Sequence, residues 1–161
     1  MNFDESLALT GEVQAIIDYR DGRQEIIDYE KIPNTVLLTG RIAVAKTLAN
    51  KIGNTFSFYV TRMVFGDGGT TGGVKKYVDA GRNGLFGTTR SVKPVISTLD
   101  PNTPNQVIFT SVLTFDDIVG VVINEMALQM SNGDLYSMTT FPDLTKTAEM
   151  QITWNWRLNF V

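Results

Sequence analysis

The segment 150–160 alternates strictly between apolar and polar side chains, and it constrains the fold more than any other part of the chain. Successive side chains of a β-strand point to opposite faces of its sheet, so this period of two predicts one long, half-buried strand. We expect Trp154, Trp156 and Phe160 to lie in the core of a mainly β domain. Truncation of either tryptophan to alanine would then cost about 3–5 kcal/mol.

Two tight-turn signals predict hairpins elsewhere in the chain. Asp21-Gly22 separates the repeated phrase IIDY at 16–19 and 26–29, and Asn132-Gly133 separates the apolar segments 120–130 and 135–141. Glycine accepts the positive φ that such turns require, which makes Asp-Gly and Asn-Gly strong hairpin signals. The remaining expected strands are 106–116 and 91–99, the second at a sheet edge because Pro94 cannot donate a ladder hydrogen bond.

One helix is expected, over residues 39–53, with Thr39 as its cap and Gly53 at its end. Its predicted apolar face consists of Ile42, Ala45, Leu48, Ala49 and Ile52. Together these elements predict a two-sheet antiparallel β-sandwich with one packed α-helix and a long glycine-rich loop. The expected organisation is a single domain, 1–161, with an extended arm (1–11), a hairpin (12–33), the helix (39–53) and the loop (66–87).

The composition excludes several classes of function. The chain has no cysteine and no histidine, so it lacks thiolate zinc ligands, disulfides and the commonest general base. We therefore expect no enzyme, no cofactor and no metal site. A net charge of -3 with scattered lysine and arginine gives no electrostatic footprint for nucleic acid. No apolar run approaches the roughly 18 residues that a membrane-spanning helix needs.

The stretch VFGDGGTTGG, residues 64–73, resembles a phosphate-binding loop only superficially. A P-loop needs Lys and then Ser or Thr directly after its closing glycine, whereas Val74 follows Gly73 here. The dinucleotide fingerprint needs a third glycine where Thr71 stands. We therefore expect a surface loop that binds no nucleotide.

Loops as long as 66–87 are usually functional or mobile, and both interpretations stay open for this one. In the functional interpretation it grips a neighbouring subunit. The expected contact residues are Gly66, Asp67, Gly68, Lys75, Lys76, Tyr77, Arg82, Leu85 and Phe86.

Glu125 is the one charge placed within an apolar strand pattern, on the face of Val121, Ile123 and Ala127. A buried carboxylate needs a partner, and we expect a structural ion pair with Arg90. Asp116 and Asp117 do not form a catalytic carboxylate pair, because neighbouring strand residues point to opposite faces.

The order of phrases from MVFGDGGTT through GLFGTTR and INEMALQM to QITWNWRLNF resembles a family of tailed-bacteriophage virion structural proteins. In layout it is similar to the attachment domain of phage tail-collar fibres, over residues 34–161. The matching positions are Gly66, Asp67 and Gly68 for the loop, Arg90, Glu125 with Leu128 for the hairpin, and Trp154 or Trp156 for the closing strand.

The resemblance implies a non-enzymatic structural protein of the virion, made in the host cytoplasm, with other virion proteins as partners and homo-oligomers as its form. Because no repetitive shaft follows, we expect an adaptor component of the tail or baseplate, with capsid-surface decoration as the alternative. Residues 1–11 and 66–87 are the expected contacts with neighbouring subunits. A carbohydrate-binding β-sandwich that uses exposed tyrosines is a weaker alternative, and an enzyme that uses Asp and Glu alone is the weakest.

Overall fold

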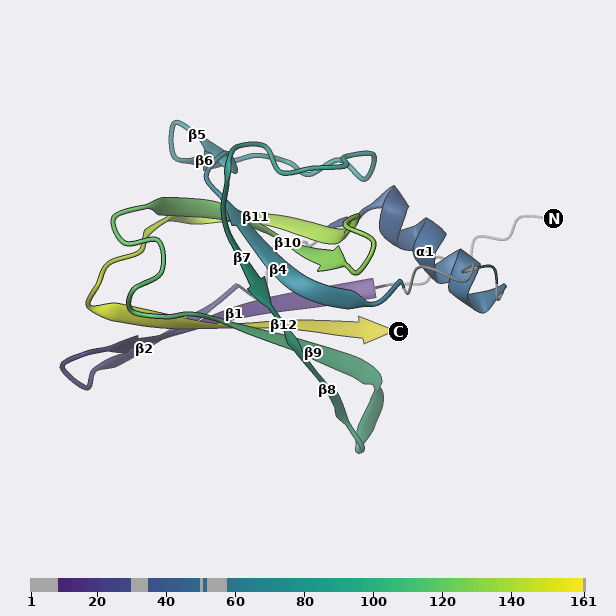
Figure 1. The fold of residues 1–161 in the computed structure, drawn as a ribbon, viewed down its shortest axis with the longest axis horizontal. Helices are drawn as coiled ribbons and strands as arrows, with labels where there is room; N and C mark the ends of the chain where they lie inside the picture. Colours follow the sequence, from purple (N-terminus) through teal and green to yellow (C-terminus); the bar gives the residue numbers. More distant parts are fainter. Residues whose placement is uncertain (1–8, 30–34, 50, 52–57, 161) are drawn as a thin grey trace.

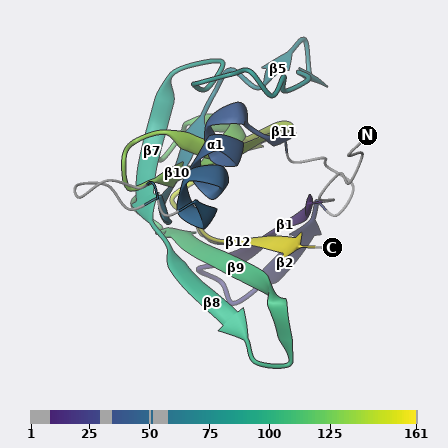
Figure 2. The same ribbon diagram turned by 90° about the vertical axis from the view of Figure 1, so that its right-hand side faces the viewer.

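The computed structural model describes residues 9–29, 35–49, 51 and 58–160. It confirms the mainly β sandwich: two five-stranded antiparallel sheets face each other, with one helix, α1, beside one end (Figures 1 and 2). The expected arm lies outside the described residues except for 9–11, which belong to the first strand. Within the described part, no helix is long and apolar enough to cross a membrane.

The first sheet is built around the C-terminal strand. Its order is β2 (Gln24–Asp28), β1 (Leu9–Tyr19), β12 (Met150–Phe160), β9 (Thr103–Leu113) and β8 (Ile96–Asp100). The strand β1 pairs with β12 along its whole length, from Leu9 opposite Phe160 to Tyr19 opposite Met150. The hairpin β1–β2 turns at Gly22, where φ is 90°. The alternating segment therefore lies at the centre of its sheet.

The second sheet has the order β3 (Thr35–Val36), β11 (Leu135–Thr145), β10 (Val122–Met130), β4 (Val60–Gly66) and β7 (Thr89–Pro94). The strand that contains Pro94 lies at an edge, as expected. The expected strand 91–99 is nevertheless two strands, because the chain leaves the second sheet after Pro94 and enters the first sheet at Ile96. A small hairpin, β5 (Thr70–Thr71) and β6 (Val74–Lys75), forms a separate two-stranded sheet.

The core lies between the sheets and is centred on the two tryptophans, both fully buried. The Trp154 ring lies 5.2 Å from the Phe141 ring and 5.6 Å from the Phe65 ring, centroid to centroid. Tyr29 stacks on Trp154 at 6.2 Å, and burial raises the pKa of this tyrosine to about 12. The expectation for Phe160 was wrong: its side chain is 37% exposed, because it is the last residue of β12, at the end of the sandwich.

The helix α1 (Leu38–Leu48) is shorter than expected and presents a different face. Leu48 of the predicted apolar face is 84% exposed, whereas Gly40 and Ala43 are buried. The reason is close approach: a Cβ atom on Gly40 would lie only 2.4 Å from the carbonyl oxygen of Tyr136 in β11. Thr39 does not cap the helix; its hydroxyl donates to the carbonyl of Leu135. Small residues thus set the packing, and the apolar periodicity misidentified the buried face.

Candidate interaction surface

The glycine-rich loop 66–87 folds onto the outer face of the second sheet (Figure 1). Its hairpin β5–β6 closes through the Lys76 N–H, which donates to the Gly69 carbonyl at 2.8 Å. The Thr140 hydroxyl of β11 donates to the Lys76 carbonyl, also at 2.8 Å. The loop is therefore hydrogen-bonded to the sheet rather than only solvated.

Glu125 of β10 is the central anchor of this loop. Its side chain is fully buried and accepts three main-chain hydrogen bonds, from Gly68 at 2.9 Å, Phe86 at 2.7 Å and Gly87 at 2.8 Å. A register shift between Ile123 and Glu125 turns the carboxylate to the outer face of the sheet, away from the core face of Ile123. One carboxylate thus joins both ends of the loop to the strand beneath it.

The expected ion pair between Arg90 and Glu125 is wrong. The Arg90 guanidinium instead donates to Asp67 at 2.6 Å, and the Thr88 N–H donates to the same carboxylate at 2.8 Å. The buried Glu125 is satisfied by main-chain N–H groups, which remove the need for a cation. Arg90 and Asp67 lie at the loop margin, where both remain partly exposed.

Opposing effects act on the Asp67 carboxyl. Partial burial favours its neutral form and would raise its pKa. The hydrogen bonds from Arg90 and Thr88, together with the Arg90 charge, outweigh burial and hold the pKa of Asp67 below its usual value. This carboxylate is therefore ionised at neutral pH and ties the start of the loop to its end.

Glycine allows the loop to approach β10 closely. A Cβ atom on Gly69 would lie 2.2 Å from the Asn124 carbonyl oxygen, a distance that real contacts do not reach. The Gly69 N–H donates to the Asn124 side chain at 2.6 Å, and that side chain donates in turn to Thr70 and Asp143, each at 3.0 Å. No pattern in the sequence pointed to Asn124, because an isolated amide within an apolar strand has no diagnostic spacing.

The second half of the loop covers an apolar patch on the second sheet. Leu85 and Phe86 pack against it, and the Phe86 ring lies beneath two cations, with Arg82 at 3.6 Å and Lys76 at 5.0 Å from its centroid. The patch consists of Val64, Ala127, Leu135 and Met138 of the sheet, and it is extended by Leu37, which precedes α1, and by Val78 of the loop itself. Six of the residues expected to contact another subunit therefore have contacts within the molecule: Asp67, Gly68, Lys76, Arg82, Leu85 and Phe86.

The loop leaves an outward-facing tip, which we define as Val74, Lys75 and Tyr77. Val74 is 70% exposed, Tyr77 is 84% exposed, and Lys75 is also exposed. The hairpin β5–β6, which carries Val74 and Lys75, lies above the second sheet (Figure 1). An aromatic ring, an aliphatic side chain and a cation on a narrow projection suit contact with another protein surface.

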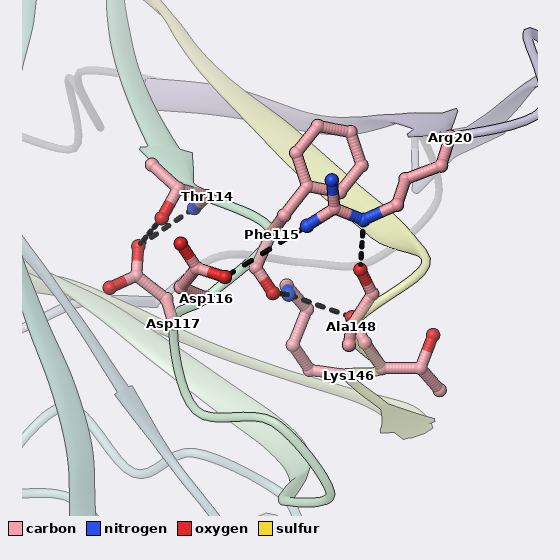
Figure 3. A network of polar contacts seen from close by, with 8 residues as sticks. Arg20, Thr114, Phe115, Asp116, Asp117, Lys146 and Ala148 are labelled. Atoms are coloured by element: carbon pink, nitrogen blue, oxygen red, sulfur yellow. Dashed lines mark hydrogen bonds and ion pairs between the residues drawn. The ribbon is translucent and has the colours of Figure 1, made fainter.

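A second polar cluster joins the loop between β9 and β10 to the loop between β11 and β12 (Figure 3). Lys146 is buried, and its ammonium donates to the carbonyls of Phe115 at 3.1 Å and Thr147 at 2.9 Å. Loss of hydration lowers the pKa of Lys146. Arg20 lies over the Phe115 ring at 4.2 Å and donates to the Ala148 carbonyl at 2.9 Å. The cluster fixes the loop before β10 to the loop before β12.

Asp116 and Asp117 belong to this cluster but have different partners (Figure 3). Asp117 accepts from the N–H and hydroxyl of Thr114 at 2.7 and 2.9 Å and pairs with Lys93 at 2.5 Å. Asp116 lies 3.9 Å from Arg20 and is almost fully exposed. Each carboxylate thus has a structural partner of its own. Among the described residues, no group of three or more acidic side chains could hold a metal ion.

Comparison with known families identifies most of the chain. Residues 35–157 match the family described as phage tail-collar fibre protein, N-terminal. The match includes the anchor Glu125, the ion pair of Asp67 with Arg90, and the exposed tip. No curated protein and no solved structure matches the chain.

Proposed function

The chain belongs to the phage tail-collar fibre family, through the N-terminal domain of that family, and on that premise we propose that it joins tail components through its exposed tip. It is a phage tail structural protein, located in the virion and assembled in the host. Within the tail we propose the role of an adaptor that works by protein contacts and catalyses no reaction. Its partners are other virion proteins and further copies of itself.

One observation carries the proposal: the tip is exposed while the loop that bears it is fixed. Glu125, Asp67 and Asn124 anchor the loop through side-chain hydrogen bonds, so Val74 and Tyr77 are presented by a preorganised element. Binding through a preorganised segment avoids the entropy cost of ordering it. An exposed aromatic residue on such a segment is a typical interface hot spot.

The family match favours the tail over the capsid surface, the alternative that the sequence left open. The loop is long, but the hydrogen bonds from its main chain to Glu125 and Asn124 hold it on β10. The glycine-rich stretch serves close packing on β10 at Gly69, and this accounts for its composition without a phosphate ligand.

Substitution at the tip tests the proposal. Phage that carry Val74→Asp together with Tyr77→Ser should assemble tails with a strongly reduced copy number of this protein, measured by quantitative mass spectrometry of purified particles. The matched control is Val119→Ser, which alters an exposed aliphatic residue elsewhere. The purified double variant should keep the wild-type circular dichroism spectrum and melting temperature. Normal copy number in the double variant would refute the role of the tip.

A further inference from the structure

The helix α1, at one end of the sandwich, carries an apolar stripe that faces solvent (Figure 1). Leu38, Ile42 and Leu48 are 55%, 44% and 84% exposed, and Ala45 between them is also exposed. Their spacing of four, three and three residues places these four side chains, the α1 stripe, on one side of the helix. Gly40, on the opposite side, packs on β11. The α1 stripe therefore takes no part in the core of the sandwich.

Two cations flank the α1 stripe. Successive residues of an α-helix are rotated by about 100°, so Arg41 and Lys46 lie on opposite sides of the midline of the stripe. Both side chains are exposed. Among the described residues no carboxylate forms an ion pair with either of them, and the Lys46 ammonium lies 5.6 Å from the centroid of the Phe58 ring. Both charges are therefore available to a partner.

The charge balance around the helix differs from that of the whole chain. Residues 31–66, which include α1, contain five of the 14 Lys and Arg residues and none of the 17 Asp and Glu residues, although the net charge of the chain is -3. A positive region in an acidic protein attracts anionic groups and disfavours cationic ones. The helix thus presents apolar side chains within a positively charged surrounding.

A groove of about 420 Å³ runs between α1 and the turn that joins β10 to β11. Ile42 and Lys46 line it on the helix side, and Asn132 and Asp134 line it on the turn side. The Asp134 carboxylate accepts a hydrogen bond from the Asn132 amide at 3.0 Å and forms no ion pair with Lys46. The groove therefore offers room for apolar side chains of a partner directly beside the α1 stripe.

We propose that the α1 stripe binds an acidic amphipathic helix of another tail protein. This inference rests on the proposed function, assembly of tail components through protein contacts, and names a second contact with the chemistry of its partner. Apolar residues of the partner, three and four positions apart, pack on the α1 stripe and into the groove. Asp or Glu side chains beside them pair with Arg41 and Lys46.

The residues of α1 disfavour two other occupants. In a pair of helices, the residues that flank the apolar seam face each other, so a second copy of α1 would set Arg41 and Lys46 against the same two cations. A membrane surface also attracts cations, but helices that lie on membranes carry Trp, Phe and Leu on a broad apolar face. The α1 stripe has no aromatic residue and includes Ala45. An acidic protein segment matches both its charge and its narrow apolar face.

Charge reversal on one flank of the stripe tests the electrostatic part of the inference. Phage that carry Arg41→Glu should contain at least about tenfold fewer copies of this protein per particle, because like charges then face each other across the contact. The matched control is Arg62→Glu, at an exposed arginine of β4, which should leave the copy number unchanged. Both purified variants should keep the wild-type melting temperature. Normal copy number in Arg41→Glu would overturn the inference.

A photo-cross-linking residue identifies the partner. Benzoylphenylalanine in place of Leu48 should join this protein to another tail protein when intact particles are irradiated. Mass spectrometry of the joined peptide should show apolar residues three or four positions apart with Asp or Glu beside them. The same residue in place of Ile26, an exposed position on β2, is the control and should not yield that peptide. A joined peptide without acidic residues, a peptide from a second copy, a joined lipid or no joining would each contradict the inference.

Charge exchange separates a lost contact from a damaged helix. In phage that carry Arg41→Glu, replacement of the cross-linked acidic residue of the partner by lysine should restore most of the lost copy number, whereas a misfolded helix would not be rescued. Failure of this rescue would show that the pairing is wrong. The tip proposal is judged separately: a loss of copies in Val74→Asp with Tyr77→Ser, but not in Arg41→Glu, would reject the α1 contact alone, and the reverse result would reject the tip alone.

Discussion

At the residue scale, Glu125 shows how a charge can be buried without a cation. Its two oxygens accept three main-chain N–H groups, and hydrogen bonds to a charged acceptor contribute about 1.5–3 kcal/mol each. Glutamine has the same shape but only one accepting oxygen. The sequence pattern correctly marked this residue as unusual, yet it misassigned the partner, because main-chain donors from a distant loop leave no trace in side-chain spacing.

We predict that Glu125→Gln lowers the free energy of unfolding by about 3 kcal/mol, since at least one buried N–H loses its acceptor and faces an amide donor. The measurement is urea denaturation monitored by tryptophan fluorescence. Glu12→Gln is the matched control: Glu12 pairs with Arg157 at 3.0 Å on the surface, so its loss should cost less than about 1 kcal/mol. Equal losses in the two variants would contradict the anchoring role.

The Asp67 carboxyl should add a pH dependence to stability. Its pKa is lowered in the native state, so the ionised carboxylate stabilises the fold above the unfolded pKa of about 4, and this contribution disappears as the pH falls through the native pKa. We predict that Asp67→Asn loses less unfolding free energy than the wild type between about pH 6 and pH 3. Arg90→Gln should reduce the dependence in the same direction. Parallel pH profiles for all three proteins would count against the pair.

At the element scale, the alternation in β12 correctly predicted a strand and the burial of both tryptophans. A period of two places every second side chain of a strand on the same face of its sheet. The same argument failed for Phe160, since alternation says nothing about where a strand leaves the core. Residues 91–99 became two strands because a chain can change sheets within one extended run. The helix presented Gly40 and Ala43 rather than its apolar stripe, because close packing on β11 required small side chains.

The loop 66–87 behaves as an element in its own right, and Gly69 is its tightest contact. Gly69→Ala should force the hairpin β5–β6 away from β10, because the new Cβ would collide with the Asn124 carbonyl. We predict faster hydrogen exchange at the Lys76 amide, which closes the hairpin, and a loss of about 2 kcal/mol in unfolding free energy. Gly84→Ala, where a Cβ meets open space, is the control and should change neither quantity. Similar exchange in the two variants would show that the contact is loose.

At the scale of the whole molecule, the sandwich separates two surfaces. The tip projects from the outer face of the second sheet, whereas β8 is an edge strand of the first sheet (Figure 1). The proposed contact through the tip involves only the second sheet and leaves the first sheet uncovered. Between them, the core and the cluster around Lys146 hold the sheets in a fixed relation.

The most direct measurement of the central claim is a cryo-electron microscopy reconstruction of the intact phage tail at a resolution that shows side chains. The proposed function predicts that Val74 and Tyr77 are buried against another tail chain, while the loop keeps its hydrogen bonds to Glu125. A reconstruction in which every copy leaves these two side chains in solvent would contradict it.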